Sequence, residues 1–313
     1  MPVIEVDNLV KWYKDVQALA GVSLAVEQGE IYGLLGRNGA GKTTMVKILL
    51  SIVHPTSGQV KLLGRPVGDA DSRMKIGYLP EDHRFPEYHS AVTALQFYGG
   101  LSGMTRADRK RRIPELIDLV GLKHAAKRKV RTYSKGMKQR LGLAQAILHD
   151  PEVVFLDEPT DGVDPLGRKE IRDVLLRLKA QGKTIFLNSH LLSEVELITD
   201  RVTILDLGKT RREGTVDQLT TTRDVYEIRF EGTLDPILPE IQSRVRSLAR
   251  FPDRIEVEVE GKPQLNVLID LLRQKGVLLT GLADKRQSLE QIFIETISGG
   301  LPQATRVEAE GRR

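Results

Sequence analysis

The segment from Gly36 to Thr44 restricts the fold of this chain more than any other part of the sequence. Residues 36–43 fit the pattern G-x-x-x-x-G-K-[ST] without a mismatch. The apolar run Ile31 to Leu35 precedes them, and Thr43 to Leu50 has the apolar spacing of a helix, so we predict a strand, a glycine-rich turn and a helix. Glycines let backbone N–H groups approach phosphate oxygens, and a helix start carries about half a positive charge. The segment therefore predicts a phosphate-binding site.

This loop also supplies candidate groups for the other parts of a bound nucleotide. The Lys42 ammonium would reach the β- and γ-phosphates, and the Thr43 hydroxyl would ligate Mg²⁺. A plain glycine-rich turn is the alternative interpretation. The nucleotide contacts expected in this loop are Gly36, Arg37, Asn38, Gly39, Ala40, Gly41, Lys42, Thr43 and Thr44.

Two adjacent carboxylates end another apolar strand, residues 153–156. Asp157 would hold Mg²⁺, directly or through water, and Glu158 would polarise the water that attacks the γ-phosphate. A solvated strand end is the alternative. His190 follows the apolar strand 184–187 after two polar residues, so it can contact the γ-phosphate; a structural histidine is the alternative.

Two further segments are candidates for nucleotide contact. Ser134 and Gly136 precede a predicted helix over 137–148, and such a turn can hold a second phosphate; a simple helix N-cap is the alternative. We place Trp12 and Tyr13 in a loop after the first strand. Either ring could stack on adenine, or it could simply pack on the surface.

Strands alternate with helices over the first two thirds of the chain. Residues 31–35, 76–79, 153–156, 184–187 and 202–205 are the strand candidates. This alternation predicts an α/β fold with a mainly parallel sheet and helices on its faces. Residues 85–148 are mostly helical in pattern, so we expect an inserted helical subdomain, in which Pro114 starts or kinks a helix.

A change of pattern near residue 220 predicts the end of the main domain, 1–220, and a small α/β accessory domain over 221–298. Alternating apolar residues predict two strands, and an apolar stripe predicts a helix with Gly276 as its C-cap. Ser288 is expected to cap a last helix over 288–297. Residues 299–313 are predicted to be disordered. The alternating and stripe residues are Tyr226, Ile228, Phe230, Ile255, Val257, Val259, Leu265, Leu268, Ile269 and Leu272.

Composition excludes several functional classes. The chain has no cysteine, so disulfides and thiolate metal sites are excluded. No apolar run approaches the roughly 20 residues of a membrane-spanning helix, and we see no secretory signal, so the chain reads as soluble and would meet a membrane through a partner. The net charge is +5, and the basic segments 106–112 and 123–138 contain no interleaved aromatic platform. We interpret them as solvated helical faces, with an acidic partner or lipid headgroups as the second possibility, and expect no nucleic acid partner.

Together these residues resemble the ATP-binding subunits of ABC transporters, over about residues 3–220. Five segments carry the resemblance in order: the Walker A loop (36–44), the signature turn (133–137), the Walker B strand (153–158), the D-loop (161–164) and a switch histidine, His190. The resemblance implies the P-loop NTPase fold, ATP and Mg²⁺ as ligands, and an ATPase coupled to transmembrane transport. It also puts Tyr13, rather than Trp12, at the adenine.

Pairing between two copies is a further implication of the resemblance. In the family two such domains join head to tail, so Ser134 and Gly136 would serve ATP held by the other copy's 36–44 loop. Asp164 of the D-loop is a further expected nucleotide contact. ATP would close this homodimer, and hydrolysis would reopen it and move a separately encoded integral membrane permease. The chain would then lie on the cytoplasmic face of the cell membrane.

The chain departs from the family pattern at three positions. The signature turn reads YSKGM, so Lys135 replaces a glycine and Met137 replaces a glutamine. Glu81 stands where the family usually has a glutamine; a carboxylate can still ligate Mg²⁺ but cannot donate a hydrogen bond when ionised. With the small C-terminal domain, these departures make the chain similar to exporter-type ATPases for drugs, polysaccharides or lipids. The alternatives are a non-transport ABC ATPase acting on nucleic acid or ribosomes, and a regulatory module that no longer hydrolyses ATP.

Overall fold

The computed structural model describes residues 2–298, which fold into two compact units. One unit holds the residues up to Val216 together with those described from Phe293, and the other holds Asp217–Ile292. The last helix, α11 (Leu289–Ile297), contributes to both units, whereas the sequence assigned 221–298 to one domain. The predicted disordered tail, 299–313, lies outside the described residues.

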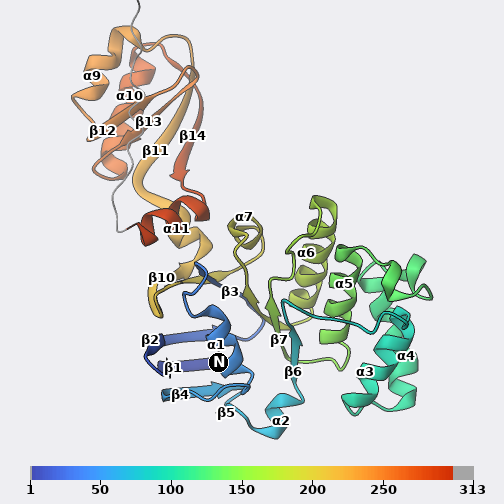
Figure 1. Ribbon diagram of the computed structural model, residues 1–313. Coiled ribbons are helices and arrows are strands. Elements are labelled where there is room, and N and C mark those ends of the chain that lie inside the picture. The colour runs from blue at the N-terminus through green and yellow to red at the C-terminus, as the bar shows by residue number, and fades with distance from the viewer. Residues whose placement is uncertain (1, 299–313) are drawn as a thin grey trace, which may run out of the picture. The chain divides into compact units, whose positions relative to one another are not determined.

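The larger unit is built on a six-stranded sheet with the order β10-β9-β3-β8-β7-β6 (Figure 1). Neighbouring strands pair in parallel except β10, which is antiparallel to β9. The predicted α/β fold with a mainly parallel sheet is confirmed, as are its five predicted strands. The strands of this sheet are β3 (Ile31–Gly36), β6 (Ile76–Leu79), β7 (Val153–Asp157), β8 (Thr184–Asn188), β9 (Arg201–Asp206) and β10 (Lys209–Thr215).

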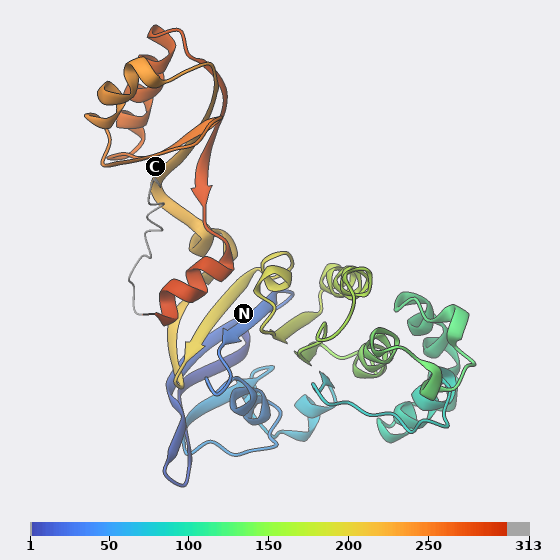
Figure 2. The same cartoon turned by 45° about the horizontal axis from the view of Figure 1, so that its top comes forward.

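Helices cover this sheet and form the inserted segment. Figures 1 and 2 show α5 between α6 and the α3–α4 pair. Helix α5 contacts α6 on one side and both α3 and α4 on the other. Short 3-10 turns at Lys123–Ala125 and Val130–Thr132 lead from α4 to α5. The helices are α1 (Lys42–Leu49), α2 (Ala70–Arg73), α3 (Ala91–Leu101), α4 (Arg106–Leu119), α5 (Lys135–Ala146), α6 (Pro165–Ala180) and α7 (Leu192–Glu196). Helix α8 (Val216–Thr220) follows, and all but its first residue belongs to the smaller unit.

Pro114 lies inside α4 rather than at a helix start, so the prediction of a helix start there is wrong. A proline in a helix interior removes one backbone hydrogen bond. The helix continues through it because Ile113, Leu116 and Ile117 are buried on both sides of the proline. The helix begins at the N-cap Thr105, whose hydroxyl accepts a hydrogen bond from the backbone N–H of Asp108.

A second, antiparallel sheet was not predicted. It has the order β2-β1-β4-β5, formed by β1 (Pro2–Tyr13), β2 (Val16–Glu27), β4 (Ser57–Leu62) and β5 (Arg65–Pro66). Trp12 and Tyr13 pair with Gln17 and Val16 across the hairpin, so their placement in a loop after the first strand is wrong. The turn uses Lys14 at φ 51° instead of the Asn-Gly type that marks such hairpins in a sequence.

Aromatic side chains fill the interior where the parallel strands pack. Tyr32, Phe155 and Phe186 have no exposed surface. The ring centroid of Phe186 lies 5.8 Å from that of Tyr32 and 5.5 Å from that of Phe155. The three rings come from β3, β7 and β8, so they hold together the strands whose ends carry the predicted site.

The smaller unit is an antiparallel sheet of order β12-β13-β11-β14 packed with helices. The alternating and stripe residues singled out in the sequence lie in its strands and helix, except Val259, which directly follows β13; all are buried in one core. Gly276 adopts φ 77° after α10 and Ser288 caps α11 by accepting from the N–H of Gln291, as predicted. The elements are β11 (Thr221–Glu231), a 3-10 turn (Asp235–Ile237), α9 (Leu238–Gln242), β12 (Ser247–Arg250), β13 (Arg254–Glu258), α10 (Lys262–Gln274) and β14 (Leu278–Arg286).

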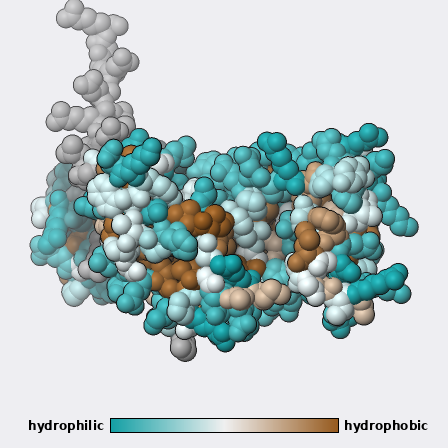
Figure 3. Space-filling model, turned by 60° about the horizontal axis from the view of Figure 1, so that its bottom comes forward, coloured by the Kyte–Doolittle hydropathy of each residue, from teal (hydrophilic) through white to brown (hydrophobic). Residues whose placement is uncertain are grey.

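The surface shows no continuous apolar band on the face drawn in Figure 3, where hydrophobic patches are separated by hydrophilic residues. Among residues 2–298, no helix combines the length and the apolar character needed to cross a bilayer. The basic segments 106–112 and 123–138 are largely exposed. Residues 106–112 lie on α4 as expected for a solvated helical face, whereas 123–134 form 3-10 turns and loops, so a helical face is wrong for that part.

Removing the central ring tests the aromatic core. We expect Phe186→Ala to lower the free energy of unfolding by about 3–5 kcal/mol, because it empties a fully buried site between two other rings. Phe97→Ala is the control, since Phe97 is 51% exposed. Denaturant unfolding of both variants measures the difference; equal losses would contradict the assignment of the core.

Candidate functional site

The predicted phosphate-binding loop connects β3 to α1. Gly39 and Gly41 adopt φ values of 82° and 105°, a region that residues with a Cβ rarely occupy. A Cβ on Gly41 would lie 2.4 Å from the carbonyl oxygen of Ala18. Glycine is therefore required there by both backbone conformation and space, and α1 begins directly afterwards at Lys42.

The Lys42 side chain is folded onto its own loop. Its Nζ donates to the carbonyl oxygens of Gly36 at 2.6 Å and Arg37 at 3.2 Å, and the residue is 7% exposed. Burial lowers the pKa of the Lys42 ammonium, while the charges of Glu158 and Asp157 act in the opposite direction. A buried ammonium held only by carbonyl groups is well placed to receive an anionic ligand.

Asp157 ends β7 opposite Asn188, the last residue of β8. The Asn188 Nδ2 donates to Asp157 Oδ1 at 2.5 Å, and Asp157 is 3% exposed. Burial raises the pKa of the Asp157 carboxyl, against the effects of the Asn188 hydrogen bond and the Lys42 charge. Asn188 thus orients a carboxylate that lacks solvent to stabilise its charge.

Glu158 follows in an unusual conformation for a residue with a side chain, at φ 51°. Its backbone N–H donates to the Asn188 carbonyl at 2.9 Å. Its Oε2 accepts from the Ser189 hydroxyl and from the His190 backbone N–H, each at 3.2 Å, and lies 2.9 Å from His190 Nδ1. The end of β8 therefore fixes the Glu158 carboxylate.

A cavity of about 550 Å³ joins these groups, a volume in the range of small-ligand sites. The loop, the Glu158 carboxylate and His190 all face this one space, although they come from parts of the chain far apart in sequence. Its lining includes Gly36, Arg37, Asn38, Lys42, Thr43, Glu81, Glu158, Asn188, Ser189 and His190.

The donor set fits Mg²⁺. The Thr43 hydroxyl and the Glu81 and Asp157 carboxylates are hard oxygen donors, and the two carboxylates lie close enough that the charge of Glu81 raises the pKa of Asp157. A cation would relieve that repulsion. Within the described residues no three His, Cys, Asp or Glu side chains cluster tightly enough to hold a metal alone. Mg²⁺ commonly takes its remaining ligands from water and substrate phosphates.

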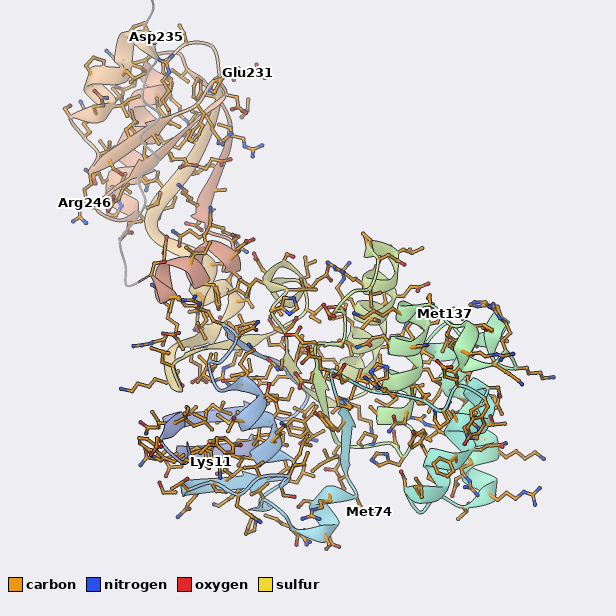
Figure 4. The ribbon with its side chains drawn as sticks, viewed as in Figure 1. Lys11, Met74, Met137, Glu231, Asp235 and Arg246 are labelled. Carbon is orange, nitrogen blue, oxygen red and sulfur yellow. The ribbon has the colours of Figure 1, made fainter. Side chains whose placement is uncertain are left out.

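Nine predicted site residues are not in the lining of this cavity: Gly39, Ala40, Gly41 and Thr44 of the loop, Asp157 next to Glu158, and Tyr13, Ser134, Gly136 and Asp164. The last four lie on other elements. Ser134 caps α5, with its hydroxyl accepting from the Met137 N–H at 3.2 Å, and Gly136 lies in the same first turn; Met137 is labelled in Figure 4. Asp164 caps α6 and accepts from the Gly167 N–H at 2.7 Å. Tyr13 is 43% exposed.

The ring of Tyr13 is covered on one side by a neighbouring lysine. Lys11, labelled in Figure 4, places Nζ 4.9 Å from the ring centroid and donates to the His54 carbonyl. The exposed part of the Tyr13 side chain suits either adenine stacking or a simple surface role.

Sequence reasoning missed Asn188 and Ser189 as members of the site. They orient Asp157 and Glu158 and line the cavity. Their position directly after the apolar strand 184–187, before His190, was the available signal, because polar residues at the ends of neighbouring parallel strands meet at one edge of the sheet.

Comparisons with known proteins show the family to which the chain belongs. A profile described as ABC transporter matches residues 19–161. An uncharacterized ABC transporter ATP-binding protein of Synechocystis sp. is 43% identical over 284 residues, which cover 90% of this chain and 79% of that protein. The chain belongs to the family of ABC transporter ATP-binding proteins.

Other members of the family extend the comparison. The bacitracin transport ATP-binding protein BcrA of Bacillus licheniformis is 34% identical over 304 residues, covering 95% of this chain and 98% of BcrA. A solved ATP-binding cassette, described as dimeric in a post-hydrolysis state with ADP and Pi, has a TM-score of 0.62 and 25% identity. The match covers 68% of this chain and 98% of that one.

Neutralising Asp157 tests the cost of burying its charge. Because the folded state raises the pKa of Asp157, ionisation at pH 7 disfavours the folded state, and this cost disappears as the pH falls below the ordinary value of about 4. We expect Asp157→Asn to unfold at higher denaturant than the wild type at pH 7 without nucleotide or metal, with the gain shrinking toward pH 4. Asp71→Asn, at an exposed position, is the control. A variant less stable than wild type at pH 7 would contradict the burial argument.

Proposed function

We propose that this chain is the Mg²⁺-dependent ATPase subunit of an exporter, working as a head-to-tail homodimer bound to a separately encoded membrane permease. The observation that carries the proposal is the Glu158 carboxylate, held beside the phosphate-binding loop by Ser189 and His190. Membership of the family supports ATP binding, and the position of the Glu158 carboxylate supports hydrolysis.

Glu158 acts as the general base in this proposal. It takes a proton from the water that attacks the γ-phosphorus, while the bond between that phosphorus and the bridging oxygen breaks and ADP leaves. Its fixed rotamer orients the water without a rearrangement during the reaction. Lys42 stabilises charge on the β- and γ-phosphates, and His190, paired with Glu158 through Nδ1, offers its other nitrogen to the γ-phosphate.

Mg²⁺ would be held by Thr43, Asp157 and Glu81 together with the phosphates. When bound, it would neutralise phosphate charge and allow the triphosphate to lie beside three carboxylates. Asn188 keeps Asp157 aimed at that position.

Two copies are proposed because the Ser134 turn does not line its own chain's cavity. A helix N-terminus with a serine hydroxyl as its cap suits a phosphate presented by a second molecule. The similar cassette described as dimeric with ADP and Pi supports the same arrangement. In it, Ser134, Gly136 and Asp164 of one copy face the nucleotide on the loop of the other, with Tyr13 beside the adenine.

Transport is proposed through a permease on the cytoplasmic side of the cell membrane. The relative BcrA is named for bacitracin transport, which supports export of a drug, lipid or polysaccharide-like cargo. The contacts that select cargo would belong to the permease.

Glu158→Gln tests the catalytic role. We expect ATP turnover to fall by more than about a hundredfold because the general base is lost, while ATP binding persists and the protein becomes dimeric with ATP. Phosphate release, nucleotide binding and sedimentation measure the three properties. Glu115→Gln is the matched control, at an exposed helix position. Normal turnover by Glu158→Gln would overturn the assignment.

The transport partner is tested with tagged chain recovered from detergent-solubilised membranes of its source cells. We expect co-purification of a protein with several spanning helices, together with ATPase activity that changes on its addition. Recovery of ribosomes or nucleic acid in place of a membrane protein would instead favour a non-transport ABC ATPase.

A further inference from the structure

Lys135, which replaces the signature glycine, forms an ion pair with Asp161 in this structure. Its Nζ lies 2.7 Å from Asp161 Oδ2, and the side chain runs across Gly162, where a Cβ would lie 2.1 Å from that Nζ. Gly162 at φ 61° therefore leaves the space that the lysine occupies. The ion pair joins the first residue of α5 to the segment that follows Glu158.

Two other contacts join the same elements. A Cβ on Gly136 would lie 3.2 Å from the Val163 side chain, so the first turn of α5 packs directly on this segment. One turn later, the buried Gln139 donates through Nε2 to the Glu158 carbonyl at 3.2 Å. The turn proposed to meet one nucleotide is thus in contact with the residue proposed to hydrolyse another.

The ion pair is partly solvated, since the side chains of Lys135 and Asp161 are 58% and 45% exposed. Hydrogen bonding from Lys135 lowers the pKa of Asp161, and the charges of His190 and Arg168 act in the same direction. Exposed pairs of this kind contribute little to stability, so the lysine can exchange partners at small cost. An ammonium has three donors on a flexible stem and readily binds phosphate oxygens.

We propose that Lys135 is an exchangeable latch: it holds Asp161 in the free subunit and transfers to the triphosphate of the partner copy when two copies close. The inference rests on the head-to-tail pairing of the proposed function. A triphosphate carries more negative charge than one carboxylate, so closure favours the exchange. The released Asp161 carboxylate then lies on the segment that carries Glu158, near His190 and Arg168.

Asp161 is therefore a competitor of the nucleotide for Lys135. Removing its charge should tighten ATP-dependent pairing, and removing the lysine should weaken pairing and abolish the effect of Asp161. A purely structural ion pair predicts the opposite for Asp161, because its loss would loosen the α5 turn.

The experiment uses the full chain in the Glu158→Gln background and measures the dimer dissociation constant with Mg-ATP by sedimentation. We expect Asp161→Asn to tighten pairing by roughly two- to thirtyfold, because two exposed pairs open for each dimer formed. Lys135→Gln should weaken pairing, and adding Asp161→Asn to it should have no further effect. Asp71→Asn, an exposed aspartate paired with Arg65, controls for net charge, and unfolding curves confirm that each variant is folded.

The outcomes separate this inference from the function on which it rests. If Glu158→Gln pairs with ATP but Asp161→Asn leaves pairing unchanged, weakens it, or acts equally with and without Lys135, the latch is overturned and the function stands. If Glu158→Gln shows no ATP-dependent pairing at all, the proposed function fails, and the latch fails with it.

Discussion

The site depends on the parallel pairing of β7 with β8, which brings Asp157 level with Asn188. Because the two strands end together, the residues that follow them lie at the same edge of the sheet. The Glu158 carboxylate therefore accepts hydrogen bonds from the Ser189 hydroxyl and the His190 backbone N–H. Strand β3, on the other side of β8, delivers the glycine loop to the same edge. The aromatic rings of Tyr32, Phe155 and Phe186 pack these three strands together and thereby support the geometry of the candidate site.

Much of this arrangement follows from sequence pattern. Apolar runs such as 153–156 fix a buried strand, and the polar residues that end each run must then share an edge of the sheet. The glycine loop was predictable because residues 36–43 fit G-x-x-x-x-G-K-[ST] between an apolar run and a helical pattern. The family resemblance gave the order of the motifs along the chain, but it gave no distances between the side chains of the site.

The parts that escaped prediction depend on contacts distant in sequence or on weak local signals. The β1–β2 hairpin turns at Lys14 without a glycine, and its strands of 12 residues contain bulges that break the alternation. Asn188 looked like an ordinary strand end, since its hydrogen bond to Asp157 spans 31 positions. Lys135 looked like a local departure, but its partner Asp161 is 26 positions away. Pro114 was misjudged because burial of its neighbours outweighs one lost hydrogen bond.

The charge balance at the site gives a physical reason for a metal in the proposed reaction. Lys42 is the one cation acting on Asp157 among the causes of its raised pKa, whereas Glu81 and Glu158 both act against its ionisation. A triphosphate placed on the loop would add further negative charge beside these three carboxylates. Lys42 alone cannot offset that repulsion, because one ammonium already faces more than one carboxylate. A divalent cation held by Asp157 would reverse the sign of the interaction, so the burial that disfavours the ionised Asp157 carboxylate also favours a metal-bound nucleotide.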